Sequence, residues 1–357
     1  MMELPRTMSA MVLTRHGGLD AYEWHEDWPV PVPGPGEVLI RVAACGLNNT
    51  DVNTRVGWYS KAVKGATADD ASDQAGDDPG WGGALDLPRI QGADVCGRIV
   101  AVGDGVDPGL IGKRVIVDCW LRDREPPGYL GSERDGGFAE YCAVPAVNVA
   151  AIDSDLSDAE LATFSCSYAT ALGMLTRAEV GPEDTVLVTG ASGGVGGALV
   201  QIAKAKGARV VALASESKHE AVAQLGPDAL LERAPADLQA ALEAAIGAPK
   251  VSVVADIVGG PYFPTLIDAL ARRGRYVTSG AIAGPIVDLD LRTLYLQDLT
   301  LYGSTVTPPE IFRELVRLIE TGAIRPVLAA TYSLRELREA QTAFMEKRHV
   351  GNIVVTP

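Results

Sequence analysis

The sequence lacks the features that would place it in a membrane or outside the cell. Its 357 residues contain no run of about 18 apolar residues, the length that a membrane-spanning helix needs. The N-terminal segment Met1–Met11 has no apolar core of the kind found in a signal peptide. Cysteines are few, odd in number and scattered, which favours reduced thiols over a disulfide framework. We therefore expect a cytoplasmic protein that does not bind a membrane.

Positive charge and histidine are also scarce. Lysine and arginine together number 31 against 46 acidic residues, which gives a formal net charge of −15. Such a charge argues against broad binding to nucleic acid. The four histidines have no metal-ligand spacing: His16, His25, His219 and His349. The length suits two domains of a globular protein.

A glycine-rich turn is the most informative stretch of the chain. The β-branched and apolar run Thr185–Thr189 leads into it, a helical apolar pattern follows as far as Gly207, and Arg209–Leu213 forms a second strand-like run. Strand, glycine turn, helix and strand are the context of a dinucleotide-binding turn, in which bare backbone and a helix N-terminus meet a pyrophosphate. The predicted contacts are Ser192, Gly193, Gly194 and Val195.

The remaining chain divides into two composition types. Residues 1–151 show short strand patterns separated by glycine and proline, interrupted by an acidic, glycine-rich insertion at 61–85. Ser157–Glu160 is a capping-box pattern near the boundary, and strands then alternate with helices, which predicts a doubly wound parallel sheet over 152–307. Helix and strand patterns in the tail, 308–357, are expected to return to the first domain.

Several motifs taken together resemble the medium-chain dehydrogenase/reductase superfamily. They are Pro33–Leu39, Gly92–Gly97 followed by Val100–Gly103, Gly112–Val115 and the glycine turn. The resemblance implies an α/β protein with a GroES-like β-rich catalytic domain (1–151, completed by 308–357) and a Rossmann domain (152–307). It also implies hydride transfer with a nicotinamide cofactor in the cleft between them.

The resemblance also bears on metal binding. The ligands of catalytic zinc in this family align with Asn48, Ala93, Asp94 and Cys166, so only one position keeps a ligand type found there. The stretch 121–137, which corresponds to the structural-zinc lobe, contains no cysteine. Because catalytic zinc needs about three protein ligands, we expect no metal. The sequence then looks like the zinc-free quinone oxidoreductase branch.

That branch suggests three further site residues. Asn48 matches an asparagine in a Gly-x-Asn loop, Tyr59 a tyrosine eleven residues later, and Thr170 a threonine in the helix that enters the Rossmann domain. Reduction of an enone or a quinone places negative charge on an oxygen, which the Asn48 amide or the Tyr59 hydroxyl would stabilise. The simpler alternatives are a loop cap for Asn48, a packed aromatic for Tyr59 and helix packing for Thr170.

The tip of the second Rossmann strand suggests NADPH. An acidic residue that would hold the ribose hydroxyls of NADH is absent from Ala214 and Ser215, whereas Ser215, Lys218 and Arg233 suit a 2′-phosphate. Glu216 is close in sequence, and its carboxylate would disfavour a 2′-phosphate. Further cofactor contacts are expected at Ile257, Ser279, Gly280 and Asn352.

We therefore predict an NADPH-dependent oxidoreductase that reduces a quinone or an α,β-unsaturated carbonyl compound without zinc, its catalytic residues being Asn48 and Tyr59. The alternatives are an alcohol dehydrogenase with a rebuilt zinc site, an enoyl thioester reductase, or a crystallin-like protein that binds NADPH without catalysis. The partners expected are a small-molecule substrate and a second copy of the chain. The apolar alternation of Leu299–Ser304 is typical of an edge strand through which a homodimer forms.

Overall fold

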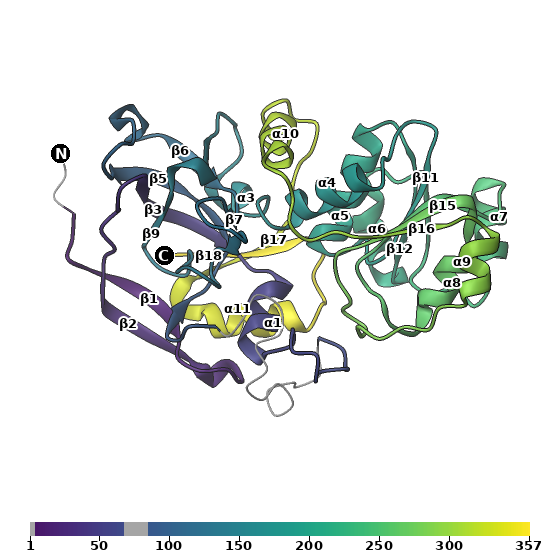
Figure 1. The fold of residues 1–357 in the computed structure, drawn as a ribbon, viewed down its shortest axis with the longest axis horizontal. Helices are drawn as coiled ribbons and strands as arrows, with labels where there is room; N and C mark the ends of the chain where they lie inside the picture. Colours follow the sequence, from purple (N-terminus) through teal and green to yellow (C-terminus); the bar gives the residue numbers. More distant parts are fainter. Residues whose placement is uncertain (1–3, 68–84) are drawn as a thin grey trace.

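Two lobes lie side by side along the long axis of the molecule (Figure 1). The computed structural model describes residues 4–67 and 85–357. One lobe holds both chain termini and the β-rich first part of the chain, and the other alternates strands with helices. The predicted fold class, α/β with a β-rich domain beside a Rossmann domain, is confirmed.

The first lobe is built around a seven-stranded, mainly antiparallel sheet. Its strands run in the order β10-β6-β5-β3-β18-β17, and β9 also pairs with β3. They are β3 (Glu37–Gly46), β5 (Asp94–Val102), β6 (Arg114–Val117), β9 (Tyr141–Pro145), β10 (Val149–Ala151), β17 (Leu328–Ser333) and β18 (Asn352–Thr356). Because β18 pairs antiparallel with β3, the C-terminal tail returns to this lobe as the sequence predicted.

Smaller elements surround this sheet. The strands β1 (Thr7–Leu13), β2 (Tyr22–Pro29) and β4 (Arg89–Ile90) form a three-stranded sheet, and β7 (Trp120–Leu121) pairs with β8 (Gly128–Tyr129). Helix α1 (Asn49–Val56) follows β3 directly, and α11 (Leu337–Met345) lies between the two strands of the tail. The loop between β3 and α1 therefore faces the second lobe and the tail.

The second lobe is a six-stranded parallel sheet, as the alternating pattern predicted. Its order is β13-β12-β11-β14-β15-β16, and each neighbouring pair is parallel. The strands are β11 (Thr185–Val188), β12 (Arg209–Ala214), β13 (Ala229–Glu232), β14 (Val251–Asp256), β15 (Leu270–Thr278) and β16 (Thr300–Gly303). The helices are α5 (Gly194–Ala205), α6 (His219–Ala223), α7 (Leu238–Ile246), α8 (Phe263–Asp268) and α9 (Leu291–Leu296). The strand order reverses between β11 and β14, where ligands of such sheets bind.

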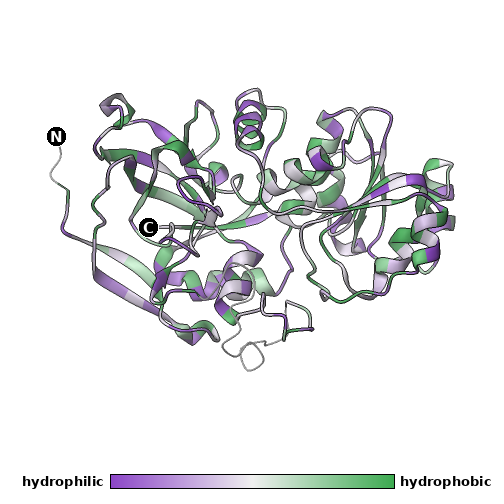
Figure 2. Ribbon diagram, in the orientation of Figure 1, coloured by the Kyte–Doolittle hydropathy of each residue, from purple (hydrophilic) through white to green (hydrophobic). Residues whose placement is uncertain are grey.

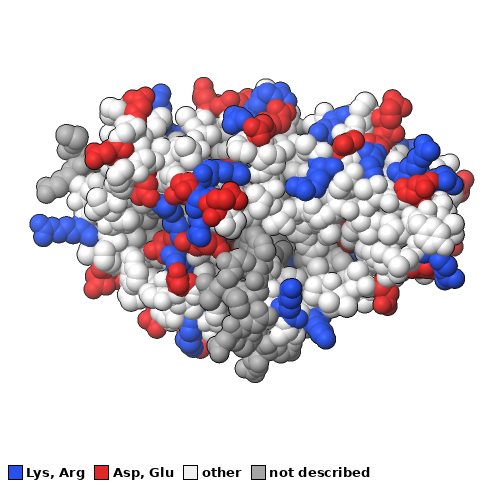
Figure 3. Space-filling view, in the orientation of Figure 1, with Lys and Arg blue, Asp and Glu red and all other residues white. Residues whose placement is uncertain are grey.

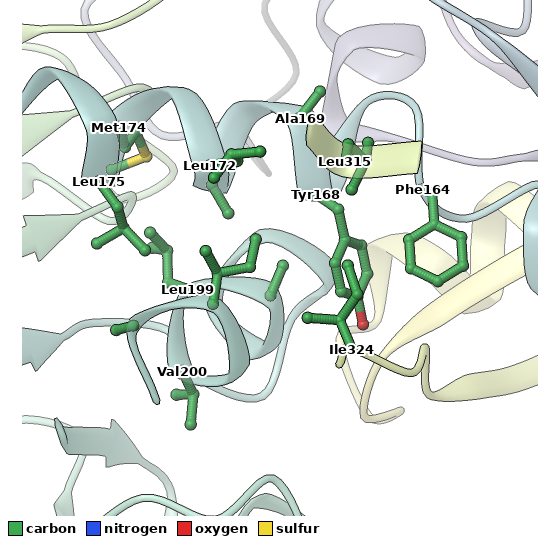
Figure 4. Packing of buried hydrophobic residues seen from close by; sticks show 14 of the residues in the cluster. Phe164, Tyr168, Ala169, Leu172, Met174, Leu175, Leu199, Val200, Leu315 and Ile324 are labelled. Carbon is green, nitrogen blue, oxygen red and sulfur yellow. The ribbon is translucent and has the colours of Figure 1, made fainter. Parts of the chain in front are cut away.

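Helix α4 (Ser167–Arg177) joins the two lobes and packs against α5 and α10 (Pro309–Glu320). Figure 4 shows Leu172 and Leu175 of α4 pointing toward α5, which carries Leu199. All three side chains are buried. This apolar contact fixes the start of α4, and with it Ser167, against the glycine turn that opens α5.

The predicted capping box is confirmed. Ser157 precedes α3 (Asp158–Leu161), its hydroxyl accepts from the Glu160 amide at 3.2 Å, and the Glu160 carboxylate accepts from the Ser157 amide at 2.8 Å. Both bonds satisfy N–H groups that a helix start leaves open. Helix α3 therefore begins directly after Ser157, as the capping-box pattern in the sequence predicts.

Two segments of the second lobe differ from the sequence prediction. The helix expected over 262–271 ends at Asp268, and β15 begins at Leu270 rather than 275. A bulge in β15 opposite β14 accommodates the early residues, with Arg273 in the left-handed region at φ 63°. Helix α9 was not predicted, because its apolar side chains Leu291, Tyr295 and Leu296 are exposed and give no buried helical face.

The surface mixes charges of both signs. Figure 2 shows hydrophobic and hydrophilic residues alternating around α10, and Figure 3 shows acidic and basic side chains interspersed over the face in view. Within residues 4–67 and 85–357, no helix has both the length and the apolar character of a membrane span. The predicted insertion at 61–85 falls mainly on residues 68–84, which lie outside the described residues.

Candidate active site

A cavity of about 330 Å³ lies between the lobes, at the carboxyl ends of the parallel strands. It brings together residues from both lobes and from the tail that are far apart in the sequence. The predicted site residues in its wall are Asn48, Tyr59, Thr170, Gly194, Val195, Ile257, Ser279, Gly280 and Asn352. Ser192 and Gly193 line a smaller adjoining hollow, whereas Ser215, Lys218 and Arg233 line neither space.

The glycine turn leaves the start of α5 open to a ligand. Gly193 precedes the helix in an extended conformation, and no side chain caps its first turn. The tail crosses this turn, since the Gly351 amide donates to the Ser192 carbonyl at 2.9 Å. Free N–H groups at a helix N-terminus attract anions, so the turn can hold a pyrophosphate. The residues present therefore fit a dinucleotide.

A buried carboxylate shapes the floor of the crevice beside the turn. Asp256 ends β14 and accepts from the Thr189 hydroxyl at 2.6 Å and the Tyr276 hydroxyl at 2.5 Å. It also accepts from the Val258 amide at 2.8 Å. These bonds use its oxygens internally, so Asp256 holds the loop that carries Ile257 in place rather than facing a ligand.

Asn48 is anchored in a network that spans both lobes. Its amide nitrogen donates to Asp94 at 2.9 Å, and its carbonyl accepts from the Ser167 hydroxyl at 3.3 Å. Asn352 of the tail donates to the same hydroxyl at 3.2 Å. The Asn48 side chain is therefore fixed in direction, and one hydrogen of its amide has no partner among the residues described.

Tyr59 stands elsewhere in the cavity wall, beside α1. Burial raises the pKa of its phenol, so the hydroxyl keeps its proton at neutral pH, and the phenol is hydrogen-bonded to the side chains of Asn53 and Thr50. The Asn53 carbonyl oxygen is buried without a hydrogen-bond partner in the described structure. A buried acceptor of this kind is costly unless a bound molecule or water donates to it.

The metal-ligand positions of the family are occupied by groups that already bond one another. Asp94 is fully buried and accepts from both the Asn48 amide and the Cys166 backbone N–H. The Cys166 sulfur accepts from the Tyr129 hydroxyl at 3.0 Å, and burial raises the pKa of this thiol. A neutral thiol, one carboxylate, an amide and the methyl of Ala93 do not fit the ligand set of catalytic zinc. No cluster of three or more His, Cys, Asp or Glu within the described ranges has metal-binding geometry.

The residues expected at the 2′-phosphate lie beside the tail. The Lys218 ammonium donates to the His349 carbonyl at 3.0 Å and to the Lys347 carbonyl. Arg233 lies close enough to lower the pKa of Lys218, after desolvation, which is the larger cause. The Glu232 carboxylate is near the same strand tip, where it accepts from the Glu216 amide at 3.0 Å. Two cations, Lys218 and Arg233, and two acidic residues, Glu216 and Glu232, thus lie near this strand tip.

Comparison with known proteins places the chain in a family. Residues 34–154 match the alcohol dehydrogenase GroES-like domain, and residues 194–321 match the zinc-binding dehydrogenase model. A solved structure titled as a putative alcohol dehydrogenase from Sinorhizobium meliloti 1021 is 48% identical, covers 99% of this chain and 98% of that one, and superposes with a TM-score of 0.92. The chain belongs to the medium-chain dehydrogenase/reductase superfamily. It is an oxidoreductase of that superfamily.

Curated relatives carry three different names. An NAD-dependent alcohol dehydrogenase from Sulfurisphaera tokodaii is 28% identical over 93% of this chain and 96% of its own length. An acryloyl-coenzyme A reductase from Metallosphaera sedula is 28% identical over 98% and 100%. A quinone oxidoreductase from Sus scrofa is 27% identical over 96% and 95%. The relatives of this family therefore include an alcohol dehydrogenase, an acryloyl-coenzyme A reductase and a quinone oxidoreductase.

Sequence reasoning missed the partners that hold the predicted residues. The sequence indicates Asp94 only as a metal-ligand position, and Ser167 and Asn53 are not among the predicted site residues. Asn53 lies in α1 six residues before the predicted Tyr59, which offers only a weak signal for it. Nothing local marks Ser167, because its partners Asn48 and Asn352 reach it only through the fold.

Proposed function

We propose that this protein uses NADPH to reduce a quinone or an α,β-unsaturated carbonyl compound without zinc. The observation that carries the proposal is the composition of the cavity. One wall holds the uncapped start of α5, another holds Asn48 and Tyr59, and the metal-ligand positions hold a closed hydrogen-bond network. The quinone oxidoreductase and acryloyl-coenzyme A reductase relatives support an acceptor with a conjugated carbonyl.

The side chains act on the oxygen of the acceptor. Bound NADPH supplies the hydride. As negative charge grows on the carbonyl oxygen, the protonated Tyr59 phenol and the open hydrogen of the Asn48 amide stabilise it by hydrogen bonding. Tyr59 or a water molecule then supplies the proton. Because Asp94 and Ser167 fix Asn48 in advance, little reorientation is needed when the acceptor binds.

The preference for NADPH rests on the charges at the tip of β12. Lys218 and Arg233 lie near each other, and Ser215 takes the place of an acidic residue. Small hydroxyl and cationic groups favour a 2′-phosphate, whereas Glu216 and Glu232 oppose it. The cations and the hydroxyl outnumber the carboxylates, so we assign NADPH.

An oxidation screen tests the reaction. NADPH and NADH oxidation is followed at one enzyme concentration with quinones, enones, an enoyl-coenzyme A and simple aldehydes, each with and without a chelator. We expect NADPH-dependent turnover of quinones or enones that the chelator leaves unchanged. Turnover confined to aldehydes or alcohols and lost with the chelator would favour the rebuilt zinc site. Turnover of the enoyl-coenzyme A alone would favour the thioester reductase.

Removal of the Tyr59 hydroxyl tests the catalytic assignment. We expect Tyr59→Phe to lower kcat by roughly 10- to 100-fold, since one oxyanion donor is lost, with the Kd for NADPH unchanged. Tyr141→Phe is the matched control, because Tyr141 lies in β9 outside the cavity wall. Stopped-flow kinetics and fluorescence titration provide the two measurements. An unchanged kcat would remove Tyr59 from the mechanism.

We also propose that the chain forms a homodimer through the edge of its Rossmann sheet. β16 is the terminal strand of that sheet, and nearby apolar side chains are exposed: Ile286 at 69%, Leu291 at 65%, Tyr295 at 62% and Leu296 at 59%. A second copy would continue the sheet and cover this patch. Sedimentation of the intact chain is expected to give a dimer that Tyr295→Glu converts to a monomer. A monomeric wild type would contradict the proposal.

A cytoplasmic location is likewise our proposal. All five cysteines are free and buried, as suits a reducing compartment.

A further inference from the structure

The wall of the main cavity carries no charge among the residues that the structure describes. It consists of side-chain amides, hydroxyls, thiols, aromatic rings and small or apolar residues, with no Lys, Arg, His, Asp or Glu among them. Burial raises the pKa of the Cys119 and Cys166 thiols and of the Tyr129 phenol, so these groups stay neutral as well. A ligand in this cavity therefore meets dipoles and apolar surface at the described wall.

Carboxyl groups, and not cations, hold the proposed donor Asn48 from outside the cavity. Asp94 accepts from the Asn48 side-chain amide at 2.9 Å, Asp51 accepts from its backbone N–H at 2.8 Å, and neither carboxyl lines the cavity. The Lys347 ammonium contacts the wall from outside, where it donates to the Asn49 side chain at 2.9 Å, and it does not line the cavity either. An anionic acceptor would thus lose its hydration here without gaining a cation in exchange.

Trp58 presents a fixed aromatic surface next to the proposed donor Tyr59. Its ring packs edge-on against the Tyr59 ring, with 5.7 Å between the ring centres and an angle of 76° between the planes. The indole N–H donates to the Gly65 carbonyl at 3.1 Å, which holds the ring in one direction. Val56 and Val63, which do not line the cavity, pack against it. Trp58 therefore offers a ligand apolar ring surface, because its N–H is already bonded.

A second apolar surface in the wall is a buried cluster of thiols and aromatic rings. Its members are Ala93, Cys119, Trp120, Tyr129 and Cys166, and all but the alanine line the cavity. Trp120 packs edge-on against Tyr129, with ring centres 5.0 Å apart. The Thr50 side chain is hydrogen-bonded both to the Cys166 thiol and to the Tyr59 phenol, so the cluster adjoins that phenol. An acceptor whose carbonyl oxygen reaches Tyr59 is thus close to aromatic surface from both groups.

We propose that the acceptor is an uncharged enone or quinone that carries an aromatic ring, and that Trp58 selects it by packing against that ring. The inference rests on the proposed function and narrows its substrate class. Aromatic rings that meet edge-on or offset gain more than the burial of the same apolar area. A carboxylate, or the phosphates of a coenzyme A thioester, would meet no cation at the described wall.

The experiment compares four enones at saturating NADPH: benzylideneacetone, its para-carboxy derivative, the straight-chain enone with the same number of carbon atoms, and methyl vinyl ketone. Wild-type kcat/KM is expected to be at least about tenfold higher for benzylideneacetone than for the carboxylate, because a charge is costly to bury without a partner. The straight-chain enone should rank between benzylideneacetone and methyl vinyl ketone. Naphthoquinone and its sulfonate provide the same comparison of charge among quinones. Equal kcat/KM for the charged and uncharged members of these pairs would overturn the charge assignment.

Variants of Trp58 test the selecting residue. In Trp58→Leu, the ratio of kcat/KM between benzylideneacetone and the straight-chain enone is expected to fall by about three- to tenfold through KM, because the ring contact is lost. Trp58→Arg places a cation in the wall and should reduce the discrimination against the carboxylate by about tenfold. Trp28→Leu, in β2 outside the cavity wall, is the matched control and should change neither ratio. An unchanged ring preference in Trp58→Leu would show that another residue selects the acceptor.

Two further measurements separate this inference from misfolding and from the proposed function. The unfolding midpoint and the NADPH affinity of each variant, measured on the full chain, show whether the fold and the cofactor site are intact. The wild-type comparison of enones needs no variant, so a variant that fails to fold leaves the inference open to refutation. Equal turnover of all four enones would overturn the inference while the reduction of conjugated carbonyls stands. Turnover of an enoyl-coenzyme A alone, or of no enone or quinone at all, would overturn both.

Discussion

Replacing Gly196 with alanine is expected to abolish dinucleotide binding and to destabilise the Rossmann lobe. A Cβ atom on Gly196 would lie 2.1 Å from the Gly190 carbonyl oxygen and 2.8 Å from the Ala191 Cα. Both neighbours are backbone atoms of the glycine turn, so no side-chain rotation relieves the clash. The start of α5 has to move away from β11, and the N–H groups that face the pyrophosphate move with it. Overpacking of this kind costs about 1–3 kcal/mol of unfolding free energy.

Gly197→Ala is the matched control for that variant. Its Cβ would meet the Leu225 side chain at 3.3 Å and the Ala191 carbonyl at 3.6 Å, contacts that a small shift accommodates. Alanine also has the higher helix propensity, by roughly 0.8–1 kcal/mol. Thermal unfolding and NADPH titration of both variants check the expectation. Normal NADPH affinity in Gly196→Ala would show that the turn does not position the cofactor.

Local pattern was enough to predict the framework around this turn. Thr185–Thr189, the helix from Gly194 and the strand from Arg209 all show strong periodicity, and the structure has β11, α5 and β12 within a residue of those limits. The start of β15 and the presence of α9 depend instead on tertiary structure, which the local pattern does not show. β15 begins early because its first residues pair with β14 across a bulge, and α9 exposes the apolar residues that a buried helix would hide.

In the candidate site, too, the residues of local motifs were predictable and their distant partners were not. The sequence and its resemblance to the family indicated Asn48, Tyr59 and the glycine turn, because each belongs to a local motif. Their partners come from distant parts of the chain: Asp94 is 46 residues from Asn48, and Ser167 is 119 residues away. No periodicity encodes such pairs.

The hydrogen-bond network at the metal-ligand positions contains a buried carboxyl group, Asp94, whose pKa is shifted by its surroundings. Asp94 is fully buried, and among the described residues its hydrogen bonds come from the Asn48 amide and the Cys166 N–H, with no cation bonded to it. Burial raises the pKa of this carboxyl from 3.8 to about 7, although both hydrogen bonds act to lower it. Asp51, which caps α1 and accepts from the Asn48 backbone amide at 2.8 Å, is raised to about 7 in the same way. The two carboxyls are therefore more basic in the folded protein than in the unfolded chain.

The pH dependence of stability follows from this pKa shift. Below about pH 4 Asp94 is protonated in both states and carries no penalty. Between pH 4 and 7 the unfolded chain releases the proton while the folded protein keeps it, so the free energy of unfolding falls as pH rises. Above pH 7 the decrease in the free energy of unfolding is complete. By linkage it is on the order of 4 kcal/mol for the Asp94 carboxyl.

Asp94→Asn is therefore expected to be more stable than the wild type at pH 8 and close to it at pH 4, as measured by urea unfolding across that range. The new amide can donate to the Asn48 carbonyl once the Asn48 side chain turns over, because the Ser167 hydroxyl accepts as well as donates. Asp94→Ala is the contrasting variant: it leaves the Asn48 amide and the Cys166 N–H without an acceptor and should lose about 1–3 kcal/mol per group at pH 4. At pH 8 this loss is partly offset, because the variant also lacks the carboxyl that destabilises the wild type there. The Asp51 carboxyl remains in both variants, so a part of the wild-type slope persists. A difference between wild type and Asp94→Asn that does not change with pH would mean that Asp94 is ionised throughout, held by a charge that the hydrogen-bond network does not contain.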